Sequence, residues 1–259
     1  MSTIARVGQI PYLNCEPFYH GLALEGVELC PMPPSYMGPL AQAERLDAGP
    51  FSLVQSFDLG DRYDYLGSMG ISVKGPVLSI LFYSRAPMEE LSGALVGATR
   101  ESATAVQLMK VILERRRGVR PKEYTALDVP GLDAFLLIGD DALTTHGRVD
   151  GYPYRYDLAE EWLDWKGLPF VFAVWMARKS LDDGVKAMLA DGLRRNLALN
   201  MENNLETIAR KRARMGMTSD EVAGYLRAFR YTLDGEDMEA IDVFKQAWRS
   251  LPTAKEATA

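Results

Sequence analysis

The chain of 259 residues is long enough to bury a substantial core as one large domain or two smaller lobes. Apolar residues make up 47% of it and charged residues 25%, a balance that is typical of folded proteins and excludes a disordered chain. The formal net charge of −6 excludes an overall positive potential that would attract nucleic acid or anionic membranes. An anionic ligand must therefore be held by local hydrogen-bond donors.

Cysteine usage and hydropathy predict a cytoplasmic protein. The two cysteines, Cys15 and Cys30, form no CxxC pair and are expected to be reduced thiols. The N-terminal residues lack the apolar core of a signal peptide. The longest apolar run, residues 170–177, is far shorter than the roughly 20 residues that span a bilayer, so no membrane partner is expected.

Short β-like runs alternate with helical patterns along most of the chain. This alternation predicts an α/β fold with largely parallel sheets. Strands are predicted at residues 5–10, 27–30, 52–55, 76–83, 95–98, 134–138 and 170–177. Helices are predicted at residues 16–24, 37–48, 103–115, 158–165, 181–203, 220–229 and 236–248.

The later helices carry clear start signals. A capping residue followed three positions later by a carboxylate marks three helix starts: Ser180 with Asp183, Thr218 with Glu221, and Asp234 with Asp237. The last helix also has an apolar stripe at helical spacing, which indicates packing against a sheet. These C-terminal helices are therefore interpreted as structural.

The usual motifs of cofactor and nucleophile chemistry are absent from the sequence. The sequence contains no GxGxxG, GxxxxGK[ST], GxSxG or HExxH. It therefore gives no motif-based sign of a phosphate-binding glycine loop, a hydrolase nucleophile or a zinc-protease site. The two histidines, His20 and His146, are expected to be structural or surface residues, and no metal site is expected. Four carboxylates at loop or helix-start positions are typical of helix-dipole partners, although a general base among them stays open: Glu101, Asp140, Asp141 and Asp157.

Five short blocks of sequence, taken in order, carry a family resemblance. The first is Ile-Pro-Tyr-Leu-Asn-Cys-Glu-Pro-Phe at residues 10–18. The others lie at residues 75–80, 99–104, 136–142, and 154–158 continuing into 167–175. Together the five blocks lie within about two-thirds of the chain. The C-terminal helices match the family only in their general character and carry none of the blocks. In these blocks the chain resembles the chorismate dehydratases of the futalosine route to menaquinone.

The resemblance implies a bilobal fold like that of type II periplasmic binding proteins, with two α/β lobes and a ligand cleft between them. The chain would cross between lobes near a Pro-containing turn at residues 84–87, and again where a strand meets a capped helix at residues 175–180. We therefore expect residues 1–86 with 176–259 to form one lobe and residues 87–175 the other. Periodicity alone does not select this layout.

The resemblance also implies a cofactor-independent hydro-lyase that removes water from chorismate to give 3-[(1-carboxyvinyl)oxy]benzoate. Loss of the C3 proton and the C4 hydroxyl makes a benzene ring, so aromatisation drives the reaction without a redox cofactor or a metal. The charge left at C3 spreads onto the ring carboxylate, where oriented donors would stabilise it. The resemblance further implies that the enolpyruvyl carboxylate of the substrate takes the proton, in keeping with the absence of a His or Glu at the matched positions.

The matched blocks supply most of the candidate site residues. Asn14 and Ser79 are expected at the reaction centre, where Asn14 would donate to the departing hydroxyl and Ser79 would orient the enolpyruvyl group or a carboxylate. Neither is a convincing base at neutral pH. A predicted helix start at Ser102 favours an anion, although simple N-capping explains this residue equally well. The substrate-binding candidates are Ser56, Ser102, Ala103, Thr104, Gly139 and Asp157.

The role of one segment that departs from the family pattern stays open, and so do two alternative functions. Family members carry a Ser-Ser pair and a carboxylate near the end of the third strand, where this chain has Gln-Ser-Phe-Asp at residues 55–58. One alternative is a non-catalytic binding protein for a carboxylated small molecule. The other is the related dihydroxynaphthoate synthase, although Tyr-Leu-Asn-Cys at residues 12–15 stands where that family has a Pro-Asn-Asp-Thr type loop. Whether the chain forms a homodimer also stays open.

Overall fold

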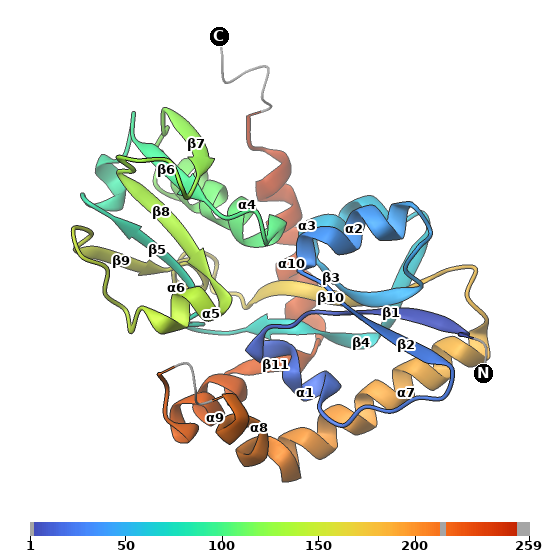
Figure 1. Cartoon of the computed structure of the whole chain (residues 1–259). Coiled ribbons are helices and arrows are strands. Elements are labelled where there is room, and N and C mark those ends of the chain that lie inside the picture. The colour runs from blue at the N-terminus through green and yellow to red at the C-terminus, as the bar shows by residue number, and fades with distance from the viewer. Residues whose placement is uncertain (1–2, 213–215, 253–259) are drawn as a thin grey trace.

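The computed structural model describes residues 3–212 and 216–252, which form two β-sheets lying side by side with helices around them (Figure 1). Strands β1, β2 and β3 of the larger sheet are parallel, whereas β10 is antiparallel to β3 and β4, and β11 is antiparallel to β4. In spatial order the larger sheet consists, within the described residues, of β11 (Phe229–Thr232), β4 (Tyr63–Val73), β10 (Phe170–Arg178), β3 (Ala48–Ser52), β1 (Ala5–Gln9) and β2 (Val27–Pro31).

The smaller sheet is also mixed. Strand β6 is parallel to β7 and β8, whereas β5 is antiparallel to β8 and β9. The prediction of largely parallel sheets is therefore wrong, because the alternation of strands and helices does not determine strand direction. In spatial order this sheet consists, within the same ranges, of β7 (Glu123–Ala126), β6 (Leu95–Ala98), β8 (Ala134–Ile138), β5 (Ile80–Ser84) and β9 (Tyr154–Asp157).

Helices cover both sheets. Figure 1 shows α2 and α3 above the larger sheet, α7 below it, and α4 beside the smaller sheet. Strand β3 is buried at every position, as expected for a strand with helices on both faces. No helix in the described part of the chain has the length and apolar character needed to cross a membrane. The helices are α1 (Glu16–Tyr19), α2 (Pro34–Gln42), α3 (Leu53–Leu59), α4 (Ala103–Val111), α5 (Gly139–Thr144), α6 (Leu158–Lys166), α7 (Asp183–Leu199), α8 (Leu205–Arg212), α9 (Ser219–Arg227) and α10 (Gly235–Arg249).

Two of the three predicted helix starts are confirmed. Complete capping boxes are present at Thr218 and at Asp234. The third prediction is wrong, because α7 begins after Asp182 and not after Ser180. The Asp182 carboxylate accepts a hydrogen bond from the Val185 N–H at 3.1 Å, so a neighbouring acidic residue takes the capping role.

The third strand ends earlier than predicted. The pattern predicts a strand at residues 52–55, but β3 ends at Ser52 and α3 follows directly. Glycine and proline are residue types typical of turns, yet Gly49 and Pro50 lie within β3, where Pro50 pairs with Trp175 of β10. The unusual run at residues 55–58 therefore lies in a helix and not at a strand end.

The chain passes between the sheets earlier than predicted. Residues 74–79 connect β4 to β5, and α6 with residues 167–169 connects β9 to β10. Strand β5 pairs within the smaller sheet and β10 within the larger one, so the predicted boundaries at 86/87 and 175/176 fall after β5 and inside β10. Pairing with distant strands decides sheet membership, and no local turn signal reveals it.

Candidate active site

A cleft lies between the two sheets, where parallel strands of each sheet end. It holds about 540 Å³ of empty space, including space open to solvent. Ile10 follows β1 and Ser52 ends β3 on the side of the larger sheet, while Ser102 and Gly139 follow β6 and β8 of the smaller sheet. The carboxyl ends of parallel strands are where ligands usually bind in α/β proteins.

The structure brings four of the predicted site residues together in this cleft. Asn14 lies in the short 3₁₀ turn after β1, and Ser79 lies in the first crossing between the sheets. Ser102 and Gly139 complete the group from the opposite side. Residues that are far apart in the sequence thus share one cavity, and their roles there stay predictions.

Ser79 is the last residue before β5 and follows a strained turn. Leu78 has a φ of +60°, which is uncommon for a residue with a side chain. Ser79 is only 2% exposed, and its Oγ accepts a hydrogen bond from the Tyr225 hydroxyl at 2.9 Å. Its carbonyl accepts from the Gly139 N–H at 2.8 Å, so that glycine amide is already used within the fold.

Asn14 is oriented by the next residue. Its Oδ1 accepts a hydrogen bond from the Cys15 thiol at 3.5 Å. Burial raises the pKa of the Cys15 thiol well above its ordinary value, so the thiol stays protonated and donates. This contact uses the amide oxygen as an acceptor and leaves the amide N–H groups of Asn14 as donors for a ligand.

Ser102 is the N-cap of α4. Its Oγ accepts a hydrogen bond from the Ala105 N–H at 3.2 Å, so the capping interpretation holds for its side chain. Ala103 and Thr104 occupy the first turn of α4, where backbone N–H groups have no acceptor within the helix. Neither residue lines the cleft itself, but Ser102 does, and the helix dipole favours a negative charge beside it.

Ser56, Thr104 and Asp157 lie outside the cleft lining, and their polar side-chain atoms are used within the fold. The Ser56 hydroxyl donates to the Leu53 carbonyl at 2.6 Å within α3. The Thr104 Oγ1 accepts from the Val54 N–H at 3.1 Å and so links α4 to α3. A substrate contact by any of these three side chains stays a prediction.

Asp157 anchors the first crossing to the start of α6. One carboxylate oxygen accepts from the N–H groups of Val77 and Leu78 at 2.8 and 2.6 Å. The other accepts from Ala159 and Glu160 at 3.0 and 3.3 Å. Burial raises the pKa of the carboxyl to about 6, although these four backbone donors act in the opposite direction. The geometry therefore favours a structural role.

Ser52 lines the cleft and was not predicted from the sequence. It is 3% exposed, and its Oγ has no hydrogen-bond partner among the described residues. A buried hydroxyl without a partner is costly, which favours a ligand contact at this position. The signal that would have identified it is the end of the third strand, which the sequence pattern placed too late.

Tyr12 and Glu101 join the two sides of the cleft. Tyr12 follows β1 and Glu101 follows β6, and the phenol donates to the Glu101 Oε2 at 2.6 Å. Burial raises the pKa of Tyr12 well above its ordinary value, so the phenol stays a donor. The Tyr12 ring also covers Gly139, where an added Cβ would lie 3.8 Å from the ring.

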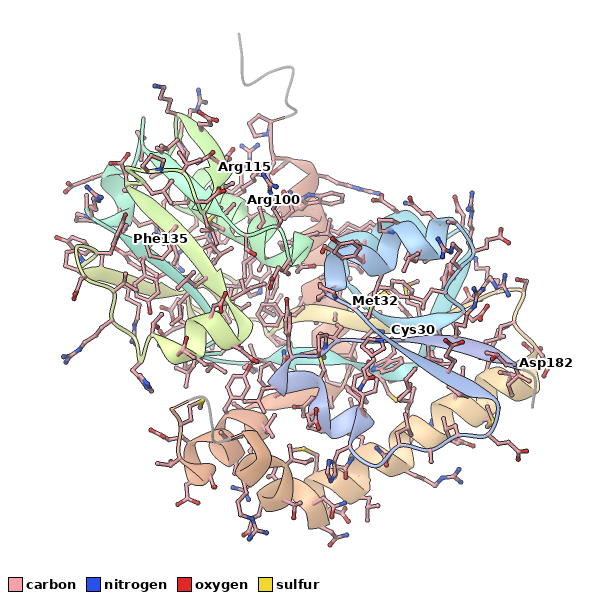
Figure 2. All side chains as sticks on the ribbon, in the orientation of Figure 1. Cys30, Met32, Arg100, Arg115, Phe135 and Asp182 are labelled. Atoms are coloured by element: carbon pink, nitrogen blue, oxygen red, sulfur yellow. The ribbon has the colours of Figure 1, made fainter. Side chains whose placement is uncertain are left out.

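The cleft is mainly apolar, and its polar lining residues are uncharged. Among the described residues, its lining includes no Asp, Glu, His, Lys or Arg. His20 lies outside it, with Nδ1 3.9 Å from a carboxylate oxygen of Glu16. Arg100, labelled beside α4 in Figure 2, is exposed and also lies outside the lining. A bound anion would therefore meet oriented dipoles, set among the apolar side chains of Ile10, Ile71, Ile138, Phe172 and Phe229.

The chain is similar to known proteins over almost its whole length. A family model described as menaquinone biosynthesis matches residues 5–249. A curated relative from Thermus thermophilus, named chorismate dehydratase, is 28% identical over 258 residues, covering 91% of this chain and 92% of that protein. The resemblance to chorismate dehydratases is therefore confirmed.

Solved structures share the fold. A protein from Archaeoglobus fulgidus has a TM-score of 0.74 and 17% identity, covering 95% of this chain and 97% of that chain. A Candida albicans gene product with the generic periplasmic binding protein fold has a TM-score of 0.66 and 11% identity, covering 98% of this chain and 93% of that one. At these identities the similarity shows the fold alone, and the predicted bilobal architecture is confirmed.

Proposed function

The chain belongs to the menaquinone biosynthesis family, and on that premise we propose that it is a chorismate dehydratase. The proposed reaction is a cofactor-independent elimination of water from chorismate to give 3-[(1-carboxyvinyl)oxy]benzoate in the cytoplasmic futalosine route. One observation carries the proposal. The cleft combines apolar walls with the uncharged polar side chains of Asn14, Ser52, Ser79 and Ser102.

This lining suits a small carboxylated ring. The apolar side chains can pack against the faces of the cyclohexadiene, while the amide and hydroxyl groups can donate to its two carboxylates and its hydroxyl. The first turn of α4 adds the positive end of a helix dipole near Ser102. Donors fixed in place before the substrate arrives do not need to reorganise as charge develops in the reaction.

The proposed elimination uses a group of the substrate as its base. The C3–H bond breaks toward the enolpyruvyl carboxylate, its electron pair enters the ring, and the C4–O bond breaks. The departing hydroxide takes up the transferred proton and leaves as water. We assign Asn14 to the departing hydroxyl and Ser79 to a carboxylate. The absence of a carboxylate or imidazole from the described cleft lining supports this route. The raised pKa values of Tyr12 and Cys15 disfavour either as a base.

The direct test is incubation of the purified protein with chorismate. Mass spectrometry should detect a product lighter by one water (about 18 daltons), and ultraviolet spectra should show a new aromatic absorbance. Asn14→Ala and Ser79→Ala should each lower kcat by roughly 100-fold or more, the loss typical of a missing oriented donor. Chorismate that binds and is recovered unchanged would identify a non-catalytic binding protein, whose fold this chain shares.

The identity of the base has its own test. His20→Ala, Glu101→Gln and Asp157→Asn should all retain turnover within about tenfold, because none of these side chains lines the cleft. A variant that binds chorismate with normal affinity but does not convert it would assign the base to the protein. That result would contradict substrate assistance and leave the proposed reaction itself intact.

A further inference from the structure

Tyr225 reaches the proposed reaction centre from a helix that the sequence pattern marked as structural. It lies on α9 and donates its hydroxyl hydrogen to the Oγ of Ser79, 146 positions earlier in the chain, at 2.9 Å. Both side chains are buried, with exposures of 4% for Tyr225 and 2% for Ser79. Ser79 lines the cleft, whereas Tyr225 stands behind it.

The ring of Tyr225 is held in a defined place. It packs edge-on against Phe229, with ring centroids 5.1 Å apart and an interplanar angle of 82°. Phe229 itself lines the cleft, so the same contact joins α9 to the cleft wall. The helix begins with the complete capping box at Thr218, which stabilises its first turn. The phenol is therefore positioned by packing before it meets Ser79.

The direction of the hydrogen bond decides what Ser79 can offer a ligand. The geometry of the contact makes the Tyr225 hydroxyl the donor and the Ser79 Oγ the acceptor. Burial raises the pKa of Tyr225 well above its ordinary value, so the phenol keeps the proton that it donates. A serine hydroxyl has one hydrogen to donate and two positions at which it accepts. Because its oxygen accepts from Tyr225, the Ser79 hydrogen remains available for an acceptor in the cleft. A donor chain of this kind also polarises each O–H group in turn.

We propose that Tyr225 is a positioning residue that holds Ser79 as a hydrogen-bond donor toward a carboxylate of the bound ring. This inference deepens the proposed function and rests on it. Without the phenol hydroxyl, the Ser79 hydroxyl is free to rotate and to accept as well as donate. It would then contribute less to binding an anion and to stabilising charge as the C3 proton leaves.

Tyr225→Phe tests the inference, because it removes one oxygen and keeps the ring. We expect kcat/KM for chorismate to fall about 10-fold, the size of effect expected for one lost hydrogen bond next to a charged acceptor. Tyr231→Phe is the matched control. Tyr231 is also buried, but its hydroxyl has no partner among the described residues and it does not line the cleft. This control should keep wild-type kinetics.

A double-mutant cycle with Ser79→Ala separates positioning from a general structural effect. The dissociation constant of the product dianion, 3-[(1-carboxyvinyl)oxy]benzoate, would be measured by calorimetry in all four proteins of the cycle. Tyr225→Phe should weaken binding about 5- to 10-fold when Ser79 is present and less than 2-fold when it is absent. Equal weakening in both backgrounds would overturn the role of Tyr225 while leaving the dehydratase proposal intact. A wild-type protein that neither converts chorismate nor binds this product would overturn the proposed function itself.

Discussion

Replacement of Thr104 by valine removes a hydrogen-bond acceptor with little change in shape. Val54 lies in the first turn of α3, where its N–H has no acceptor within the helix, and Thr104 Oγ1 accepts from it at 3.1 Å. Thr104 is 1% exposed and Val54 is half-buried, so the variant leaves a partly buried N–H without a partner. Such a loss costs about 1–3 kcal/mol, and the partial exposure favours about 1–2 kcal/mol. For a chain of this size, the midpoint of thermal unfolding should fall by roughly 2–8 °C.

The assay for Thr104→Val combines urea unfolding with steady-state kinetics on chorismate. We expect the loss of stability together with a KM within about 2-fold of wild type, because the hydroxyl lies outside the cleft lining. Thr99→Val is the matched control, since its Oγ1 accepts from the exposed Glu101 N–H, which water can satisfy, and stability should change by less than about 0.5 kcal/mol. An unchanged free energy of unfolding with a KM raised 10-fold or more would mean that Thr104 contacts the substrate, and the structural reasoning would be refuted.

Three further predictions concern the cleft and its surroundings. Ser52→Ala should raise the KM for chorismate about 10-fold in kinetic assays without lowering the thermal midpoint, because it removes a buried hydroxyl that has no partner among the described residues. Tyr12→Phe removes the hydrogen bond to Glu101 and should raise KM roughly 3- to 10-fold, whereas Glu101→Gln, which keeps an acceptor, should raise it less. Burial raises the pKa of Asp157 from 3.8 to about 6, so the folded state binds this proton more tightly than the unfolded state. The free energy of unfolding should therefore decrease as pH rises from 4 to 7, by at most about 3 kcal/mol relative to the same change in Asp157→Asn, as urea titrations at each pH would measure.

Local patterns were enough for two of the three predicted helix starts and for part of the strands. The capping boxes at Thr218 and Asp234 depend on residues only three positions apart, so the sequence displays them directly. Strand β4 (Tyr63–Val73) was missed, because its first half does not alternate between buried and exposed positions and its register against β10 shifts. The third strand was placed too late, and the residues left out include Gly49 and Pro50, which lie within β3 although their residue types are typical of turns.

The sequence by itself determined the α/β class and two of the three predicted helix caps, and the family resemblance proposed eight candidate site residues, of which Asn14, Ser79, Ser102 and Gly139 line the cleft. Only the tertiary structure decided that β5 and β10 belong to opposite sheets, that Ser52 lines the cleft and that Tyr225 stands behind Ser79. The physical reason is the range of the interactions. Caps and side-chain alternation act between neighbours in the sequence, whereas sheet membership and cleft walls depend on packing between segments that are distant along the chain.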